Sequence, residues 1–479
     1  METNTQTQQT KQQQIKPIPI AIAIMIGSFI GLFSETALNM AFTNIMEDFH
    51  IDASAVQWLT TGYLLVLGIL VPISALLLQW FSTRQLFSAS LIFSIAGTVV
   101  AALSPNFEIL LIARVIQAIG TGLLLPLMTN VILIVFPPEK RGTIMGMMGL
   151  VIMCAPAIGP TLSGLIVDSF SWNAIFWICL PLLIFTFCFG LVYMQNVSTI
   201  TKPGIDILSI ILSSIGFGGI VFGFSNAGEG AGAWGEPGVL VPLIAGVIGL
   251  VLFSIRQFKM EQPMLNLRVF KFSMFTIGLL MVFLCMMLIL SVAILLPMYL
   301  KGSLLITAFA AGLVLLPGGI VNGIMSPITG RLFDKYGPKY LVIPGFVITT
   351  LLAYLFSNVS TETSQLTIII MHTCLFIGVA MIMMPAQTNG LNQLPRHFYP
   401  VGAAVMNTLQ QIAGAIGTAV TVSIMAAGQE RYMATADATN PQVLSEALTI
   451  GVQNAFLFAC IASAIGLVVA FFIKRVEIK

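Results

Sequence analysis

The stretch "PITGRLFDKYGPKYLV" at residues 327–342 resembles an earlier stretch, "PISALLLQWFSTRQLF" at residues 72–87. The two stretches begin alike and lie 255 residues apart in the chain. Self-similarity of this kind is the signature of a fold built from repeated units. The pair therefore predicts a chain made of two related halves.

Two further pairs support this division. "LLLPLMTN" (123–130) resembles "MIMMPAQTN" (381–389), and "APAIGPTLSGLI" (155–166) resembles "AGAIGTAVTVSI" (413–424), displaced by 258 residues. Because the displacements agree within a few residues, the two halves have the same order of elements. Parallel halves related by an axis along the membrane normal are a transporter arrangement, with the substrate site between them near the midplane.

The composition indicates an all-α polytopic membrane protein. Of the 479 residues 57% are hydrophobic and only 8% are charged, about a third of the charged share usual in soluble domains. Apolar stretches of about twenty residues, each long enough to cross the bilayer as a helix, recur along the chain. We expect fourteen spans, at residues 18–42, 54–80, 84–104, 107–133, 142–167, 172–195, 205–226, 237–257, 273–300, 304–329, 339–357, 364–387, 401–427 and 449–473.

The basic residues predict the orientation of these spans. With a cytoplasmic N-terminus, only three of the twenty Lys and Arg residues lie in spans or on the outer side: Arg114, Lys301 and Arg431. An excess of Lys and Arg marks cytoplasmic loops. We therefore expect a multi-pass protein of the cell membrane with both termini in the cytoplasm, and we expect it to be a monomer.

The repeat divides the chain into four regions. Residues 1–17 form a polar tail that we expect to be disordered, and residues 18–195 and 273–473 form two six-helix bundles. Residues 205–257 are left over as two inserted helices. Because these helices contain few charged residues, we expect a lipid-facing hairpin away from any polar pathway.

Several functions are disfavoured by the sequence. The net charge of +2 gives no global basic field for nucleic acid. The six cysteines have no metal spacing, and the three histidines are widely separated, so neither a metal site nor an enzyme active site is indicated. No P-loop for ATP is present. We expect no cofactor, with a proton gradient as the energy source; a passive channel fits the repeat less well.

Four short motifs resemble those of the major facilitator superfamily, in its fourteen-helix drug:proton antiporter branch. "SETALNMAF" (34–42) is similar to the first-helix motif, with Glu35 in the place of its acid, and "LIARVIQAIGTG" (111–122) matches the fourth-helix motif at Arg114 and Gln117. The fifth-helix antiporter motif is matched by Gly159, Pro160 and Gly164, and the loop motif of the second half by Gly330, Asp334, Lys335, Gly337 and Lys339. The first-half copy of the loop motif is degraded. The resemblance implies that the fifth span helps to seal the halves during antiport; a purely packing role for Gly159 and Pro160 is the alternative.

Glu35 and Arg114 are the principal candidates for coupling. Each lies at a similar depth in its predicted span, and charges embedded in a bilayer usually face a cavity and find partners. We expect them to face one central cavity, directly or through Gln117; the alternative is a static ion pair that fixes helix positions. An ionised Glu35 would bind a cation and a protonated Glu35 would not, so proton and substrate would compete.

Further residues complete the predicted site. We expect Asn39, Gln57, Tyr63 and Gln117 to line the substrate cavity with Glu35 and Arg114. His372, in the twelfth span, is a candidate second titrating group because imidazole titrates near neutrality; the alternative is a histidine that is hydrogen-bonded within its bundle.

The sequence therefore predicts a secondary active exporter. Its partners would be protons, the lipid bilayer and small amphiphilic substrates, including cationic ones. The inward flow of protons would drive these substrates out of the cell by alternating access. Export of an endogenous solute, a lipid or a metal-chelate antibiotic is the alternative, since the motifs report fold and coupling rather than substrate.

Overall fold

The computed structural model describes residues 17–51, 53–198, 200–202, 204–227, 233–261, 263–434 and 442–476. Fourteen helices of 18 or more residues lie in this part of the chain. They are α1 (Pro17–Ala37), α3 (Ala53–Trp80), α4 (Thr83–Ala102), α5 (Phe107–Val135), α6 (Pro138–Ser169), α7 (Ala174–Tyr193), α8 (Ile207–Ala227), α9 (Pro237–Lys259), α10 (Ser273–Gly302), α11 (Ala308–Tyr336), α12 (Lys339–Phe356), α13 (Gln365–Asn392), α14 (Tyr399–Met433) and α15 (Val443–Ala470).

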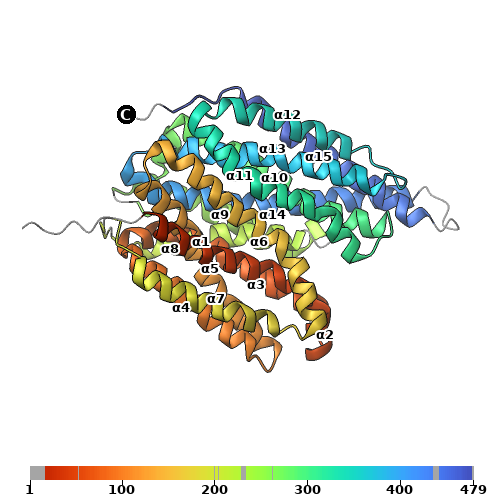
Figure 1. Cartoon of the computed structure of the whole chain (residues 1–479), viewed down its shortest axis with the longest axis horizontal. Coiled ribbons are helices and arrows are strands. Elements are labelled where there is room, and N and C mark those ends of the chain that lie inside the picture. The colour runs from red at the N-terminus through yellow and green to blue at the C-terminus, as the bar shows by residue number, and fades with distance from the viewer. Residues whose placement is uncertain are drawn as a thin grey trace, which may run out of the picture.

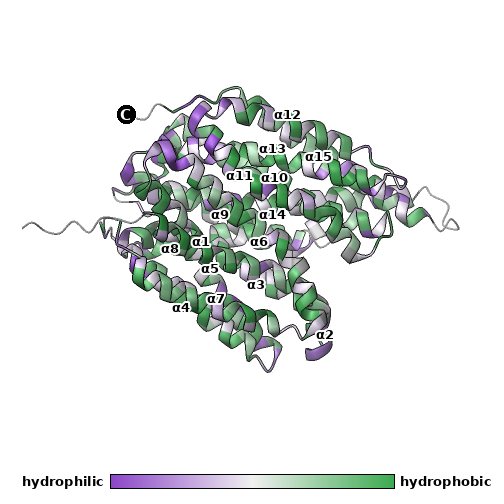
Figure 2. Ribbon diagram, viewed as in Figure 1, coloured by the Kyte–Doolittle hydropathy of each residue, from purple (hydrophilic) through white to green (hydrophobic). Residues whose placement is uncertain are grey.

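These helices confirm the predicted all-α membrane fold. Thirteen of them are long and apolar enough to span a membrane, and the fourteenth long helix, α6, corresponds to the predicted span at residues 142–167. Figure 2 shows apolar residues along nearly all of the helical ribbon. The predicted tail, up to Lys16, lies outside the described residues.

The first predicted span differs from the observed one. Helix α1 ends at Ala37, and a 3₁₀ helix (Leu38–Ala41) and the short helix α2 (Phe42–Phe49) continue the chain. A 3₁₀ segment has a tighter pitch than an α-helix, so the break changes which side chains share a face. Glu35 lies in the last turn of α1, just before this break.

Helices α1 to α7 form a first half and helices α10 to α15 a second half, which occupy the lower and upper parts of Figure 1. Two pairs of helices make the most extensive contacts between the halves, and we call these contacts the two seams: α6 packs against α11, and α3 packs against α14. In the repeat, α3 corresponds to α11 and α14 corresponds to α6. The two seams are thus related positions of the fold.

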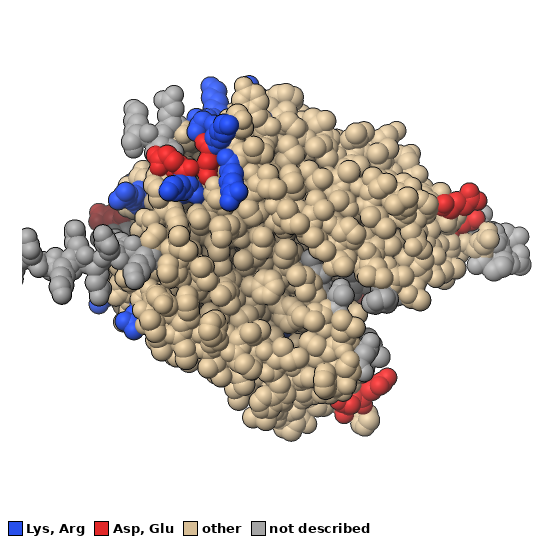
Figure 3. Space-filling view, in the orientation of Figure 1, with Lys and Arg blue, Asp and Glu red and all other residues tan. Residues whose placement is uncertain are grey.

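The halves meet closely at one end of the molecule, which we call the closed end. Arg141 at the start of α6 donates to the Asn392 Oδ1 of α13 at 3.0 Å, and Asn407 of α14 donates to the Thr129 Oγ1 of α5 at 3.4 Å. The last described residue, Val476, bonds to Asn389 at this end. On the face in Figure 3 the visible Lys and Arg side chains gather at the closed end, and a notch separates the halves at the opposite end.

The two inserted helices form a tightly joined hairpin. A methyl group added at Gly219 of α8 would meet the Pro242 carbonyl oxygen of α9 at 2.6 Å, so the two backbones are nearly in contact. At the base, the Arg256 guanidinium donates to both oxygens of Asp206, at 2.6 and 2.8 Å. Helix α9 carries many exposed apolar side chains, whereas α8 packs against both α3 and α14. The outer helix thus has a lipid-compatible surface, and the inner one contacts both halves.

Candidate functional site

Arg114 is the most deeply placed charge of the first half. Its side chain on α5 is fully buried. Its Nε donates to the Leu59 carbonyl oxygen at 3.4 Å, and its Nη1 donates to the Ser34 carbonyl oxygen at 3.2 Å and to the Gln117 Oε1 at 3.0 Å. Hydrogen bonds of this kind offset part of the cost of burying a charge. Its Nη2 has no hydrogen-bond partner among the described residues.

Tyr63 holds the guanidinium from a third helix. The Arg114 Cζ lies 4.3 Å from the centroid of the Tyr63 ring, within the range of a cation–π interaction. The Tyr63 hydroxyl donates to the Thr121 Oγ1 at 2.8 Å. Tyr63 is only 1% exposed, so it supports Arg114 inside the first half, where it also lines a small enclosed cavity.

Glu35 lies beside this network but is not bonded to it. Its side chain is partly exposed and close enough to Arg114 to interact electrostatically. The one salt bridge found among the described residues joins Arg256 to Asp206, so none joins Glu35 to Arg114. Arg114 instead binds the backbone carbonyl of Ser34, the residue before Glu35. The structure thus brings the two charges together across α1 and α5 without direct contact.

The antiporter-motif region of α6 supports the turn that carries Glu35. A methyl group at Gly159 would overlap the Thr36 Oγ1, so only glycine permits this approach of α6 to α1. The Ser163 hydroxyl donates to the Ala37 carbonyl oxygen at the end of α1, where a helix leaves carbonyls unpaired. Gly164 has only the Met40 Cε near it, at 4.0 Å. The side chains of Asn39 and Pro160 lie outside the described part of the chain.

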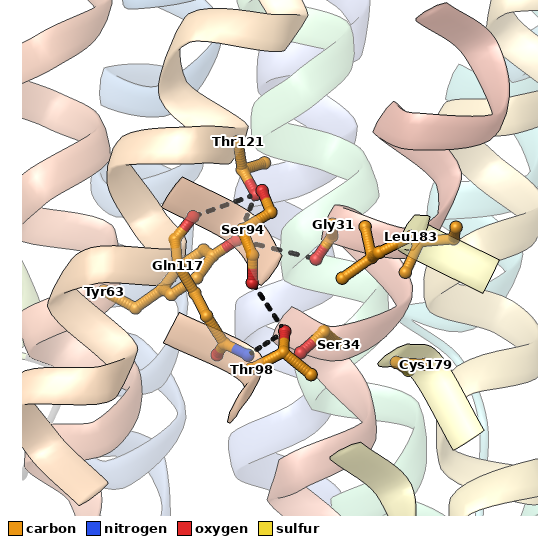
Figure 4. Close-up of a pocket in the computed structure, with 10 residues that line it drawn as sticks. Gly31, Ser34, Tyr63, Ser94, Thr98, Gln117, Thr121, Cys179 and Leu183 are labelled. Atoms are coloured by element: carbon orange, nitrogen blue, oxygen red, sulfur yellow. Dashed lines mark hydrogen bonds between the residues drawn. The ribbon is translucent and has the colours of Figure 1, made fainter. Parts of the chain in front are cut away.

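A small cavity of about 10 Å³ lies inside the first half, lined by polar and apolar side chains (Figure 4). The Gln117 Nε2 donates to the Thr98 Oγ1 at 2.9 Å, and Thr98 donates to the Ser94 carbonyl oxygen at 2.7 Å. The Ser34 Oγ, which lines the cavity, has no partner among the described residues. A cavity of this size holds about one water molecule, so it is not a drug site. Gln117 is only 4% exposed and belongs to this interior network.

The remaining predicted site residues lie apart. Gln57 is exposed on α3. His372 lies in the second half, 5% exposed, with its ring 4.7 Å from that of Phe376 and close against Gly318. Its Nδ1 has no hydrogen-bond partner within the described ranges. The structure therefore does not join His372 to Glu35 and Arg114.

The loop motif of the second half forms a contact between the halves. The Asp334 carboxylate accepts hydrogen bonds from the backbone amides of Gly142 and Thr143, both at 2.8 Å, and from the Thr143 hydroxyl at 2.7 Å. Gly337 ends α11 with a φ of 83°, a conformation that favours glycine. Lys335 places its Nζ 5.0 Å from the Tyr336 ring, and Lys339 is exposed. Of the motif's charges, Asp334 is the one that holds α6.

Arg141 is a functional candidate that the sequence analysis missed. It is 4% exposed, and besides Asn392 it binds the Phe136 and Leu133 carbonyl oxygens. Its Cζ also lies 5.1 Å from the ring of Tyr399 of α14. In the repeat, Arg141 aligns with Tyr399. The signal in the sequence was a lone arginine four residues after Pro137, which reads as an ordinary loop charge.

No group of His, Cys, Asp and Glu in the described ranges could hold a metal ion. Two helical bundles joined along two seams, with embedded charges inside the first, define a membrane transporter. Residues 24–418 match the Major Facilitator Superfamily, and the chain belongs to this family.

The relatives agree with this assignment. The chain is 66% identical to the lincomycin resistance protein LmrB of Bacillus subtilis (strain 168), over 97% of this chain and 98% of that protein. It is 27% identical to a protein named "Probable multidrug resistance protein EmrY" of Escherichia coli (strain K12), over 88% of this chain and 83% of that protein. The human organic anion transporter MFSD10 (TETRAN) has the same fold, with a TM-score of 0.66 at 13% identity, covering 95% of this chain and all of that one. These relatives are named as transporters or resistance proteins and not as enzymes.

Proposed function

We propose that this transporter exports amphiphilic drugs, cationic ones among them, in exchange for protons, with Glu35 as the coupling acid. The observation that carries the proposal is the difference in exposure between its two embedded charges. Glu35 is partly exposed and free of hydrogen bonds from described residues, whereas Arg114 is fully buried and bonded to carbonyl and amide oxygens. Solvent or substrate would therefore meet the acid and not the guanidinium.

Competition at this acid couples the two flows. A substrate cation and a proton both neutralise the carboxylate, so binding of one disfavours binding of the other. Arg114 stays in place through its bonds to Ser34, Leu59 and Gln117. Its positive charge is therefore part of the site both when Glu35 binds a proton and when it binds a cation. Release of the cation on one side and of the proton on the other then requires alternating access.

The orientation follows from the distribution of basic residues. Lys and Arg side chains visible in Figure 3 lie at the closed end, and cytoplasmic loops of membrane proteins carry the excess of these residues. We therefore place the closed end, with both termini, in the cytoplasm of the cell. In this orientation the described conformation is closed to the inside and has its notch toward the outside.

The names of the relatives support the substrate class. A lincomycin resistance protein and a multidrug resistance protein are among them. The second candidate is an endogenous solute, a lipid or a metal-chelate antibiotic as substrate, because sequence similarity indicates the fold more directly than the substrate.

Purified protein in liposomes with an imposed pH gradient provides the test. Internal pH is followed while cationic, zwitterionic and neutral drugs are added to wild type, Glu35→Gln and the control Glu108→Gln, which removes an exposed acid on α5. We expect drug-triggered proton movement in wild type and in the control, and none in Glu35→Gln.

Three other results are informative. Drug-triggered proton movement that persists in Glu35→Gln would overturn the role of Glu35, and His372→Gln would then be tested as the second predicted titrating group. A response confined to neutral drugs would contradict a cationic substrate. If wild type responds to no drug, the second candidate substrates replace drugs.

A further inference from the structure

The two seams between the halves occupy related positions but have different chemistry. One joins α6 to α11 and the other joins α14 to α3. The displacement of 258 residues aligns α6 with α14 and also brings Pro137 onto Pro395, just before each helix. The displacement of 255 residues aligns the end of α3 with the end of α11. Each residue of one seam therefore has a counterpart in the other.

The α6–α11 seam has a charged latch, formed by Asp334 on the amides of Gly142 and Thr143. Hydrogen bonds to an ionised acceptor are among the stronger ones in proteins. The C-terminal segment supports this latch, since Arg475 donates to the Asp334 carbonyl oxygen at 3.0 Å. The acid is therefore held in place on its own half while it binds the other.

The acceptor of this latch and one of its two donor amides are missing from the α3–α14 seam. Gln79 stands at the position of Asp334, and Pro400 stands at the position of Gly142. Proline has no N–H to donate. The Gln79 side chain donates to the Ala75 carbonyl oxygen of its own helix at 2.9 Å. The acceptor charge and the first donor amide have thus been lost together, and Val401, at the position of Thr143, retains an amide but has no hydroxyl.

The close approach of the backbones is also confined to one seam. A methyl group at Gly142 would meet the Gly330 carbonyl oxygen at 2.6 Å, and one at Gly146 would overlap the Ser326 carbonyl oxygen. The counterparts of Gly330 and Gly146 are Ala75 and Ala404. An added Cβ keeps helices apart, so α3 and α14 cannot approach each other as α6 and α11 do.

The inserted helix α8 fills part of the looser seam. Gly323 of α11 lies against Cys154 of α6, whereas a methyl group at its counterpart, Gly68 of α3, would meet the Val221 Cγ2 of α8 at 3.0 Å. Farther along, Trp234 donates to the Ser423 Oγ of α14. Helix α8 thus packs against α3 at the position where α6 packs against α11. The bond from Trp234 joins the hairpin to the second half.

We propose that the closed end is latched on its α6 side alone, by Asp334 on α6 with the Arg141–Asn392 bond beside it, while the α3–α14 seam, with α8 packed against it, serves as the pivot. Opening of this end then begins with release of Asp334 along the α6–α11 seam. The inserted hairpin replaces the second latch by a contact without charged hydrogen bonds. Its apolar surface against α3 allows the halves to turn without first breaking a second set of such bonds.

Rebuilding the missing latch provides the test. Spin labels are placed at Arg84→Cys and Tyr340→Cys, two exposed positions at the closed end on different halves, in a full-length chain whose six cysteines are replaced and which retains transport. Distances are measured without drug or pH gradient, so the result does not depend on Glu35. The variants are Asp334→Asn, alone and combined with Gln79→Asp and Pro400→Gly; the uncharged control replaces Gln79→Asp with Gln79→Asn.

We expect Asp334→Asn to lower the ratio of short to long distances by roughly tenfold or more, the effect of losing a charged hydrogen bond. Gln79→Asp with Pro400→Gly should restore the short distances, and the uncharged control should not. An unchanged distribution in Asp334→Asn would overturn the proposal, as would equal rescue by the control or no rescue.

Should Asp334→Asn fail to fold, the rebuilt latch is measured in the wild-type background. In that background, Gln79→Asp with Pro400→Gly gives two latches, which should increase the population of short distances and slow transport. Each single substitution should have little effect. Additive effects of Gln79→Asp and Pro400→Gly would contradict the predicted pairing.

Discussion

The Arg114 guanidinium lies close enough to the Tyr63 ring for its Cζ to be 4.3 Å from the ring centroid, inside the first half. This contact joins α5 to α3, while the hydrogen bonds of Arg114 reach α1. The position of the buried cation relative to Glu35 therefore depends on Tyr63, a residue of a third helix.

Tyr63→Leu should displace Arg114, whereas Tyr63→Phe should keep it. A desolvated cation–π contact contributes about 2 kcal/mol, and Leu removes it while Phe removes only the hydroxyl with its hydrogen bonds to Thr121 and to the Gly31 carbonyl oxygen. We expect proton movement per drug molecule to fall in Tyr63→Leu and to stay near wild type in Tyr63→Phe, measured in liposomes. Equal loss in both variants would assign the role to the hydroxyl instead.

Gly159→Ala should disrupt the turn that carries Glu35. The new methyl group overlaps the Thr36 Oγ1, and overpacking of this kind costs about 1–3 kcal/mol. We expect a lower unfolding temperature and weaker transport, with partial recovery when Thr36→Ala makes room. Gly164→Ala is the matched control, since only the Met40 Cε lies near it; a loss as large in the control would contradict the steric account.

Arg141→Gln should loosen the closed end. It removes charged hydrogen bonds to Asn392 and to two carbonyl oxygens, each with a net effect of about 1.5–3 kcal/mol. We expect faster alkylation of Cys154, which faces Gly323 in the α6–α11 seam, in a chain with the other five cysteines replaced. The neighbouring exposed Lys140→Gln is the control, and unchanged alkylation in Arg141→Gln would exclude a gating role.

The base of the inserted hairpin should respond to acid. Hydrogen bonds from the Arg256 guanidinium hold the pKa of the Asp206 carboxyl well below its ordinary range. A lowered pKa in the folded state stabilises the protein above the unfolded-state pKa, about 3.9 for Asp, and this stabilisation is lost as the pH falls below that value. Asp206→Asn should therefore lower the unfolding temperature at pH 7 by a few degrees, because the pair is partly exposed.

The difference between Asp206→Asn and wild type should shrink as the pH falls below about 4. Thermal unfolding in detergent over a range of pH measures it, with the exposed Glu261→Gln as control. A difference that does not depend on pH would show that the charge of Asp206 is not the cause.

The sequence by itself determined the class of fold and nearly all of the spans. Apolar stretches of bilayer length predict helices whatever the rest of the molecule does, because backbone groups in lipid must bond within their own segment. A second local rule explains Gly337, because glycine, without a Cβ, readily takes the positive φ that ends α11. It did not find the break after Ala37, since Ser163 and Gly159, more than a hundred residues away, support it.

Only the tertiary structure decided which of the predicted residues work together. It placed Glu35 beside Arg114 without a salt bridge, packed Tyr63 against the Arg114 guanidinium, and gave Arg141 a place between the halves. It also made the two seams unequal. The reason is physical: periodicity and apolarity act along one helix and can be read locally, whereas a hydrogen bond between helices depends on distances that the chain sets only when both bundles are packed together.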